Sequence, residues 1–225
     1  MVSHPRIWLL GRETYAGALA DMLAAQGATV HHSEESDATN AESATERLER
    51  SAEAAHAALG GIDALVFLDR MRQASAEPDP DPDRVLTEAI TASQRLFLAV
   101  RALAPRMAKD GVEGNVIVIC DDAASSGREG FLAGSAAGGA LIGMSKCLAK
   151  ELGRYRIAVN VLCHGFIEGI DTGARLTVHE QMLFKVMGLA RHGNPGHLAA
   201  NILHLARGGH WMTGQVLRVD DGLII

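Results

Sequence analysis

Aromatic residues and cysteines are scarce in this chain, and long hydrophobic runs are missing. Aromatic residues make up 4% of the sequence, and the three cysteines, Cys120, Cys147 and Cys163, form no CxxC pair. No apolar run reaches the ~18–20 residues that a membrane-spanning helix needs. The first residues lack the basic region and the cleavage site of a signal peptide. We therefore expect a cytoplasmic protein in which Cys120 and Cys163, each at the end of an apolar run, are buried free thiols.

Clustered positive charge and metal-ligand spacing are missing as well. The net charge is −6, and the lysines and arginines do not gather in any one segment. Nucleic acid is therefore not an expected partner, because binding to the phosphate backbone needs concentrated positive charge. The ten histidines include no HExxH pattern, since His179 and Glu180 are followed by Gln-Met-Leu. We expect no metal site.

What the sequence does contain is an alternation of short apolar runs with helical patterns. Apolar runs rich in Val, Ile and Leu, without polar alternation, are typical of parallel strands buried on both faces. The expected strands are Arg6–Leu10, Ala28–His32, Asp63–Leu68, Asn115–Cys120, Ile157–Cys163 and Gln215–Val219. The expected helices lie near 13–26, 41–59, 83–109, 132–154, 174–190 and 195–207. The pattern predicts an α/β fold, a single doubly wound, Rossmann-like parallel sheet flanked by helices, in one domain over residues 1–225.

Four segments carry a resemblance to a known family. They are GNVIVIC, GGALIGMSKCLAKEL and IAVNVLCHGFIE within 114–168, and TGQVLRVDDG near the end of the chain. In this order they are similar to the fifth strand, the long interface helix, the sixth strand and the closing strand of short-chain dehydrogenases/reductases, especially the 3-oxoacyl-thioester reductases. The chain is short between Val30 and Asp63, where that family has a further helix and strand. The resemblance therefore implies a family fold that is shortened in the adenine-binding region.

The resemblance also places the family's catalytic positions on residues that do not match them. The Tyr-x-x-x-Lys pair falls on Gly134 and Gly138, and neither glycine can transfer a proton. The substrate-positioning Ser falls on Asp121, and the structural Asn of the preceding helix falls on Ala92. None of the family's four catalytic residues is therefore expected in this chain, and the resemblance implies a degenerate member of the family.

The phosphate-binding turn departs from the family in the same way. Glycines after the first strand let a pyrophosphate approach the N-terminus of the following helix. The three glycine positions of the family fall on Leu10, Thr14 and Ala16, and Glu13 adds a negative charge beside them. We expect that this chain binds no nicotinamide cofactor, and that NAD is held by a partner subunit.

Subunit contacts are expected on the two long helices and the closing strand, as in the family. The glycines of 134–143 have two interpretations that stay open: close approach between helices, or drift at a site free of catalytic constraint. A chain that ends in Leu-Ile-Ile favours burial of its end against a partner. The expected interface residues are Leu96, Phe97, Leu141, Met144, Leu148, Val216, Ile224 and Ile225.

Three functions follow from this resemblance and from the residues that remain. The first is a non-catalytic structural subunit of a heteromeric NAD-dependent dehydrogenase, paired with an active paralogue in a heterotetramer. It is similar to the degenerate subunit of the 2-(hydroxybenzyl)succinyl-CoA dehydrogenase of anaerobic toluene degradation, which implies an acyl-CoA substrate. The second is a stand-alone ligand-binding or regulatory protein. The third is a repurposed enzyme with an acid–base dyad of Asp121 and His164. The alternative for these residues is structural, with Asp121 and Asp122 capping the loop that follows the strand.

Overall fold

Six parallel strands form the centre of the computed structural model, which describes residues 2–11, 14–34, 43–68, 82–167, 181–182, 184–185, 187–189, 191–208 and 211–223. The strands are β1 (Arg6–Leu10), β2 (Thr29–Ser33), β3 (Ala64–Leu68), β4 (Asn115–Asp121), β5 (Ala158–His164) and β6 (Val216–Val219). They pair in the order β2-β1-β3-β4-β5-β6. The predicted doubly wound parallel sheet is confirmed, with strand ends within one residue of the expected ones.

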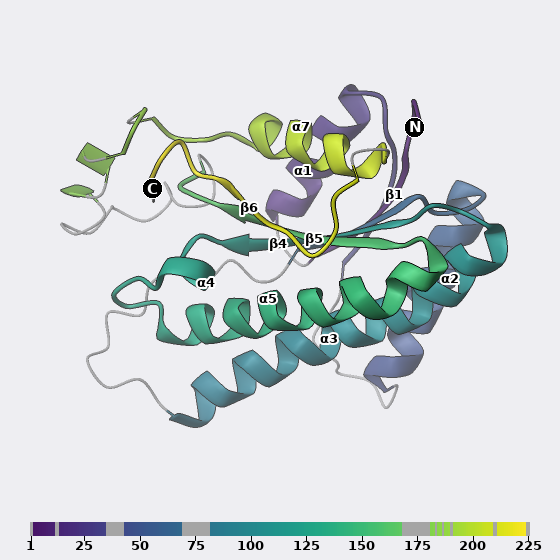
Figure 1. Ribbon diagram of the computed structural model, residues 1–225, viewed down its shortest axis with the longest axis horizontal. Helices are drawn as coiled ribbons and strands as arrows, with labels where there is room; N and C mark the ends of the chain where they lie inside the picture. Colours follow the sequence, from purple (N-terminus) through teal and green to yellow (C-terminus); the bar gives the residue numbers. More distant parts are fainter. Residues whose placement is uncertain are drawn as a thin grey trace.

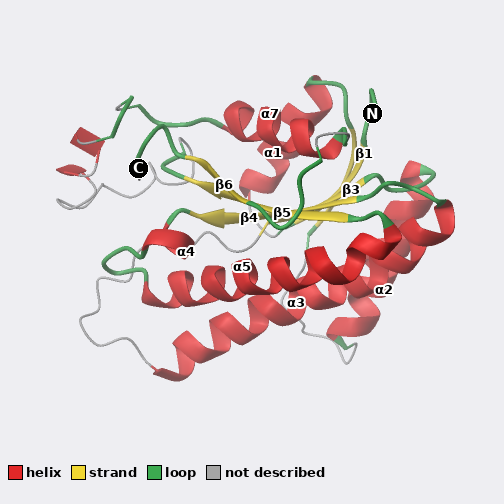
Figure 2. Cartoon of the chain, viewed as in Figure 1, coloured by secondary structure: helices red, strands yellow, loops and turns green. Residues whose placement is uncertain are grey.

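Helices cover both faces of this sheet (Figures 1 and 2). On one face lie α1 (Thr14–Ala25) and α7 (Pro195–Ala206), and on the other α2 (Ala44–Leu59), α3 (Pro82–Asp110) and α5 (Leu132–Leu152). Successive residues of a strand point to opposite faces, so the side chains of β1 contribute to two hydrophobic cores, one on each face of the sheet. Trp8 packs in the core under α3, and Leu9 in the core under α1. The domain therefore has three layers, and the helices leave the amino ends of the strands at one edge of the sheet and the carboxyl ends at the other.

Local signals at the helix ends explain where these helices begin. α2 starts with a capping box, in which Ser43 and Glu46 satisfy each other's backbone N–H groups. α7 starts in the same way with Asn194 and His197 around Pro195. Two short elements were not expected from the sequence: α4 (Ala123–Ser126) and the 3-10 turn Gly153–Tyr155. Most of the expected helix near 174–190 lies outside the described residues.

The order of the strands locates the crevice that such folds use for ligands. The order reverses between β1 and β3, and doubly wound sheets bind ligands outside the carboxyl ends of the strands at this point. β2 is the edge strand beside β1, and the described residues between β2 and β3 contain α2 alone. In the described residues this side of the sheet has the single strand β2 beyond β1, in agreement with the shortening expected from the resemblance.

The long helix α5 is apolar along much of its length. Leu132–Tyr155, which is α5 with the turn after it, is long and apolar enough to cross a membrane, and it is the one such helix among the described residues. The helix contacts α3 along its side and β4 and β5 above (Figure 1). A third of its most apolar stretch is buried inside the chain.

Candidate functional site

Polar residues gather at the carboxyl ends of β4 and β5, which are neighbours in the sheet. Asp121 and His164 lie side by side as the last paired residues of these strands. The backbone N–H of Asp122 donates to the His164 carbonyl oxygen at 2.8 Å. This edge is where the family's substrate-positioning Ser is expected. The predicted clustering of Asp121, Asp122 and His164 is confirmed.

An arginine that the sequence analysis did not single out closes this cluster. Arg128 Nη2 lies 3.0 Å from Asp121 Oδ1 and forms a second ion pair with Asp122. Its guanidinium carbon lies 4.5 Å from the centre of the Phe131 ring and 4.9 Å from that of Phe166. Only 4% of the Arg128 side chain is exposed. The charges of the cluster are thus tied to one another and covered by aromatic rings.

Burial governs the protonation of this cluster. Asp122 is 2% exposed. Its burial, and then the neighbouring charge of Asp121, raise the pKa of Asp122 to about 8, although Arg128 acts in the opposite direction. An acid of this kind is neutral for half of its population near pH 8. The cluster is therefore sensitive to pH in a range where carboxylates are ordinarily fully charged.

The acid–base dyad considered for Asp121 and His164 is not formed. His164 is fully buried, and its Nδ1 donates to the Gly165 carbonyl oxygen at 2.7 Å. Asp121 Oδ1 instead accepts the backbone N–H of Ala123 at 2.8 Å. No hydrogen bond joins the two side chains among the described residues. Asp121 has the loop-capping role, whereas the Asp122 side chain makes no cap bond.

The cysteines near this edge do not offer a nucleophile. Cys120 and Cys163 are buried free thiols, as predicted, and Cys147 is exposed on α5. Burial raises the pKa of the Cys163 thiol to about 11. Since the thiolate is the reactive form, Cys163 is inert at neutral pH.

The glycines at the family's catalytic positions have different surroundings. A Cβ built on Gly138 would lie 2.4 Å from Ala124 Cβ and 3.2 Å from Ala124 Cα, because α4 presses on α5 there. A Cβ on Gly134 or Gly143 would meet nothing within 4 Å. Close approach therefore explains Gly138, and it explains neither of the other two. Ala92, at the family's Asn position, is a residue of α3 that is buried in the hydrophobic core between this helix and the sheet.

The turn after β1 is packed with side chains at two of the family's glycine positions. Leu10 and Ala16 are fully buried, while Thr14 begins α1 and Glu13 lies outside the described residues. The glycine that the turn does require is Gly11, one residue after Leu10. A Cβ there would lie 3.0 Å from Leu68 Cβ, so this glycine lets β1 and the end of β3 approach each other.

A polar pocket of about 320 Å³ adjoins the cluster. It is bordered by Phe166, Arg191, His197, Arg218 and Asp220, among others. Arg191 Nε donates to Asp221 Oδ2 at 2.5 Å, which neutralises one side of the rim. Within the part of the chain that the structure describes, no group of three His, Cys, Asp or Glu residues could hold a metal ion.

The predicted interface residues divide into covered and accessible ones. Leu96, Leu141 and Leu148 are buried in the chain's own core, because they face α5, α3 and the sheet. Their side chains pack mainly within the chain itself, and their contact with a partner stays a prediction. Phe97 is 50% exposed. Met144 and Val216 are half-buried against the core.

Two further apolar residues extend the accessible surface on α3. Leu86 and Ile90 are exposed, and with Phe97 their spacing of four and seven residues places them on one face of the helix. Leu223 packs inside the chain against Phe166 and Met187. Ile224 and Ile225 lie outside the described residues. These three residues of α3 therefore form an apolar stripe that is open to a partner.

Comparison with known proteins identifies the family. The family model of enoyl-(acyl carrier protein) reductases matches residues 43–224. The chain belongs to the short-chain dehydrogenase/reductase family. A short-chain dehydrogenase/reductase of Serratia marcescens has the same fold, with a TM-score of 0.80, 21% identity and 98% of both chains covered. A structure described as a dehalogenation enzyme also has a TM-score of 0.80, at 24% identity over 100% of both chains.

Curated relatives match over parts of their length. Carbonyl reductase family member 4 of Xenopus tropicalis is 43% identical over 37% of this chain and 34% of its own. The 3-oxoacyl-[acyl-carrier-protein] reductase of Synechocystis is 32% identical over 58% of this chain and 52% of its own. The rat protein of the latter name is 31% identical over 73% of this chain and 67% of its own. The matches to the first two thus span a third to a half of those relatives.

Proposed function

We propose that the chain is a non-catalytic subunit of a heteromeric short-chain dehydrogenase, paired in the cytoplasm with an active paralogue. The observation that carries the proposal is the contact between Gly138 and Ala124. A lysine at position 138 would begin with a Cβ 2.4 Å from Ala124 Cβ, and the atoms it meets belong to the short helix α4 rather than to a movable side-chain end. The space that the family's lysine side chain would need is occupied by Ala124.

The other catalytic positions support the same conclusion. Gly134 has no group that could protonate a substrate oxygen. Asp121, in the place of the Ser, is held by Arg128 and by the N–H of Ala123. A carboxylate locked in this way cannot donate a hydrogen bond to a substrate carbonyl. The chain therefore contributes no proton transfer of the family's type.

The residues at the turn after β1 do not fit a dinucleotide. Leu10 and Ala16 carry side chains where the family's glycines leave room, and the amide of Gly11 donates to the Ser33 carbonyl at 3.3 Å. An amide engaged in this way is not available to a phosphate oxygen. We assign NAD binding to the partner subunit alone.

The outer face of α3 is the surface through which the subunits associate. Leu86, Ile90 and Phe97 form an exposed apolar stripe, and such stripes on a soluble protein mark interaction sites. Pairing this face with its counterpart on an active paralogue builds a helix layer shared by two subunits. Closed symmetric assemblies of two such pairs give a heterotetramer.

The association is tested by placing a charge on the stripe. Phe97→Asp is expected to abolish co-purification with an intact short-chain dehydrogenase from the same genome, because an unpaired carboxylate would be buried in the contact. Met22→Asp is the matched control, since Met22 is an exposed apolar residue of α1 on the opposite layer. Size-exclusion chromatography with light scattering gives the readout. A complex that survives Phe97→Asp, or a wild-type chain that stays monomeric beside every paralogue, rules the proposal out.

The finer part of the proposal concerns the substrate of the complex. Several relatives are named 3-oxoacyl-[acyl-carrier-protein] reductases. We propose an acyl-CoA substrate of the 2-(hydroxybenzyl)succinyl-CoA type for the partner's active site. The complex, and not this chain alone, is expected to oxidise NADH with acetoacetyl-CoA. Turnover by the isolated chain would contradict the assignment of catalysis to the partner.

A further inference from the structure

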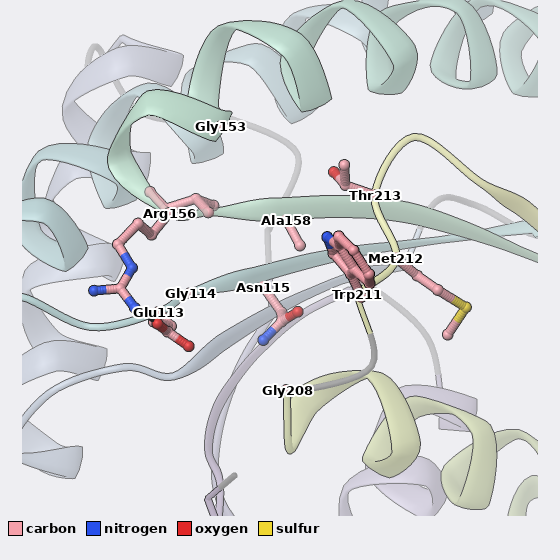
Figure 3. Close-up of a pocket in the computed structure, with 11 residues that line it drawn as sticks. Glu113, Gly114, Asn115, Gly153, Arg156, Ala158, Gly208, Trp211, Met212 and Thr213 are labelled. Atoms are coloured by element: carbon pink, nitrogen blue, oxygen red, sulfur yellow. Dashed lines mark ion pairs between the residues drawn. The ribbon is translucent and has the colours of Figure 1, made fainter.

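A second pocket lies at the opposite edge of the sheet from the family's site, beside the amino ends of β4 and β5. Its volume is about 390 Å³, within the range of small-molecule sites. Figure 3 shows Asn115 at its centre, Trp211 and Met212 on one side, and Arg156 with Glu113 on the other. Nothing in the proposed function uses this edge.

The carboxamide of Asn115 is the feature that points to a ligand. Asn115 is 3% exposed, its side chain projects into the pocket, and it has no hydrogen-bond partner among the described residues. The neighbouring Asn160 provides the contrast. Its Nδ2 donates to the Met212 carbonyl at 3.1 Å, and its Oδ1 accepts the N–H of Gln215 at 3.1 Å. The amide of Asn160 is therefore fully explained by the fold, whereas the amide of Asn115 faces the pocket and is left to water or to a ligand there.

Trp211 supplies an aromatic surface beside this amide. Its relative exposure is 104%, so the indole makes almost no contact with the rest of the chain. Its φ of 52° and the φ of 61° at Arg156 are two of the three positive values for non-glycine residues in the described part of the chain. Arg156 is the left-handed C-cap of the 3-10 turn, so the positive φ that a helix end does not explain at this pocket is that of Trp211. Such strain is often stored where a ligand is held.

The rim favours a neutral ligand. The guanidinium of Arg156 forms an ion pair with the carboxylate of Glu113, and both groups are exposed. The two charges cancel, and the remaining walls are largely apolar, with Ile157, Ala158 and Met212 beside the indole. An anion would have to break the ion pair to gain a contact.

We propose that this pocket binds a neutral, planar, largely apolar molecule whose edge carries a hydrogen-bond donor next to an acceptor. Aromatic primary carboxamides and nucleobases belong to this class. The ring stacks on Trp211, and the donor–acceptor edge pairs with the carboxamide of Asn115, which offers the complementary acceptor and donor. The site is formed by this chain alone, so its test is independent of the test of the proposed function.

Benzamide and adenine are the probes, with N,N-dimethylbenzamide as the matched control that keeps the ring and the carbonyl but has no donor. Benzamide and adenine are expected to saturate at concentrations below about 10 mM, as fits ligands of this size. The control should bind about tenfold more weakly for the loss of one hydrogen bond to a buried partner. Trp8 is fully buried, so a change in indole fluorescence reports on Trp211. Absence of saturation by both probes overturns the proposal.

Asn115→Val separates a binding role from a structural one. The variant is expected to weaken benzamide binding about tenfold, to the level of the dimethyl control, and to unfold at no lower urea concentration than the wild-type chain. Asn160→Val, which removes an amide with two partners, is expected to unfold at a clearly lower concentration. If Asn115→Val destabilises the chain as much as Asn160→Val, or binds benzamide like the wild type, the amide is not a ligand contact and the site is refuted.

Discussion

At the scale of single residues, Arg128 decides what the carboxyl edge of the sheet can do. It holds Asp121 and Asp122 together and is itself enclosed by Phe131 and Phe166. A buried ion pair of this kind adds little net stability, but removing one partner leaves a charge buried alone. The edge is therefore a closed structural cluster in which one arginine is shared by two carboxyl groups, one of which keeps its proton near neutral pH.

The first prediction concerns the pH dependence of stability. In the folded chain the pKa of Asp122 is about 8, against 3.8 when unfolded. Between these values the folded state keeps a proton that the unfolded state loses, so the stability contributed by Asp122 falls as pH rises. Asp122→Asn, which stays neutral, is expected to flatten the fall in melting temperature between about pH 5 and pH 8. Parallel profiles for the two chains would contradict this.

Asp63 is the matched control, because its shift has the opposite sign. Burial alone would raise the pKa of Asp63, but the hydrogen bonds from the Arg6 side chain and backbone outweigh it and lower that pKa. Its stabilising contribution is lost only as pH falls below its ordinary range. Asp63→Asn should therefore lower the melting temperature throughout the same window and leave the slope of the profile unchanged.

At the scale of elements, α5 provides a test within a single helix. Gly138→Ala is expected to destabilise the chain by about 1–3 kcal/mol, because the new methyl group overlaps Ala124 of α4. Gly143→Ala is expected to stabilise it by about 0.5–1 kcal/mol, since the space there is open and alanine favours a helix. Urea denaturation of the isolated chain measures both. Equal effects of the two changes would show that α4 does not constrain α5.

Most elements could be predicted from the sequence, because local patterns determine them. Buried strands such as β4 appear as unbroken apolar runs, and capping residues such as Asn194 mark where helices begin. The short helix α4 escaped prediction because four residues carry no periodicity. On α3, apolar pattern alone did not separate Leu96, which is buried, from Phe97, which is exposed. That distinction depends on how α5 packs beside it.

The residues of the site were predictable only in part, for a similar reason. Asp121 and His164 could be placed together because they end neighbouring strands. The role of Arg128 could not be predicted, because the short helix α4 that brings it back onto Asp121 and Asp122 has no sequence signal. The role of Asn115 could not, because it depends on a pocket formed by segments that are distant in the sequence. Asn115 and Asn160 look equivalent as residues within apolar strands, and their different hydrogen bonding appears only in three dimensions.

At the scale of the whole molecule, the proposed function implies that the chain lacks both the family's catalytic residues and its cofactor site. The prediction is that Gly134→Tyr and Gly138→Lys, combined with Ala124→Gly to make room, yield no reductase activity. The proton donor would then be present, but the turn holding Leu10 and Ala16 would still lack space for a dinucleotide. NADPH oxidation with acetoacetyl-CoA is the assay, with circular dichroism to show that the variant folds. Measurable turnover would mean that the cofactor site is intact.

The contact between Gly138 and Ala124 also has a consequence for the history of the chain. A lysine introduced at position 138 would meet Ala124 at once, so that mutation lowers stability before it can add any function. A prior change at Ala124 of α4 would make room for the lysine, but that change alone brings no activity for which it could be selected. If the family's lysine once stood at position 138, as the proposed function implies, each single step back toward it is harmful or idle. Under that proposal the contact between Gly138 and Ala124 works as an evolutionary ratchet and holds the chain to roles that need no lysine.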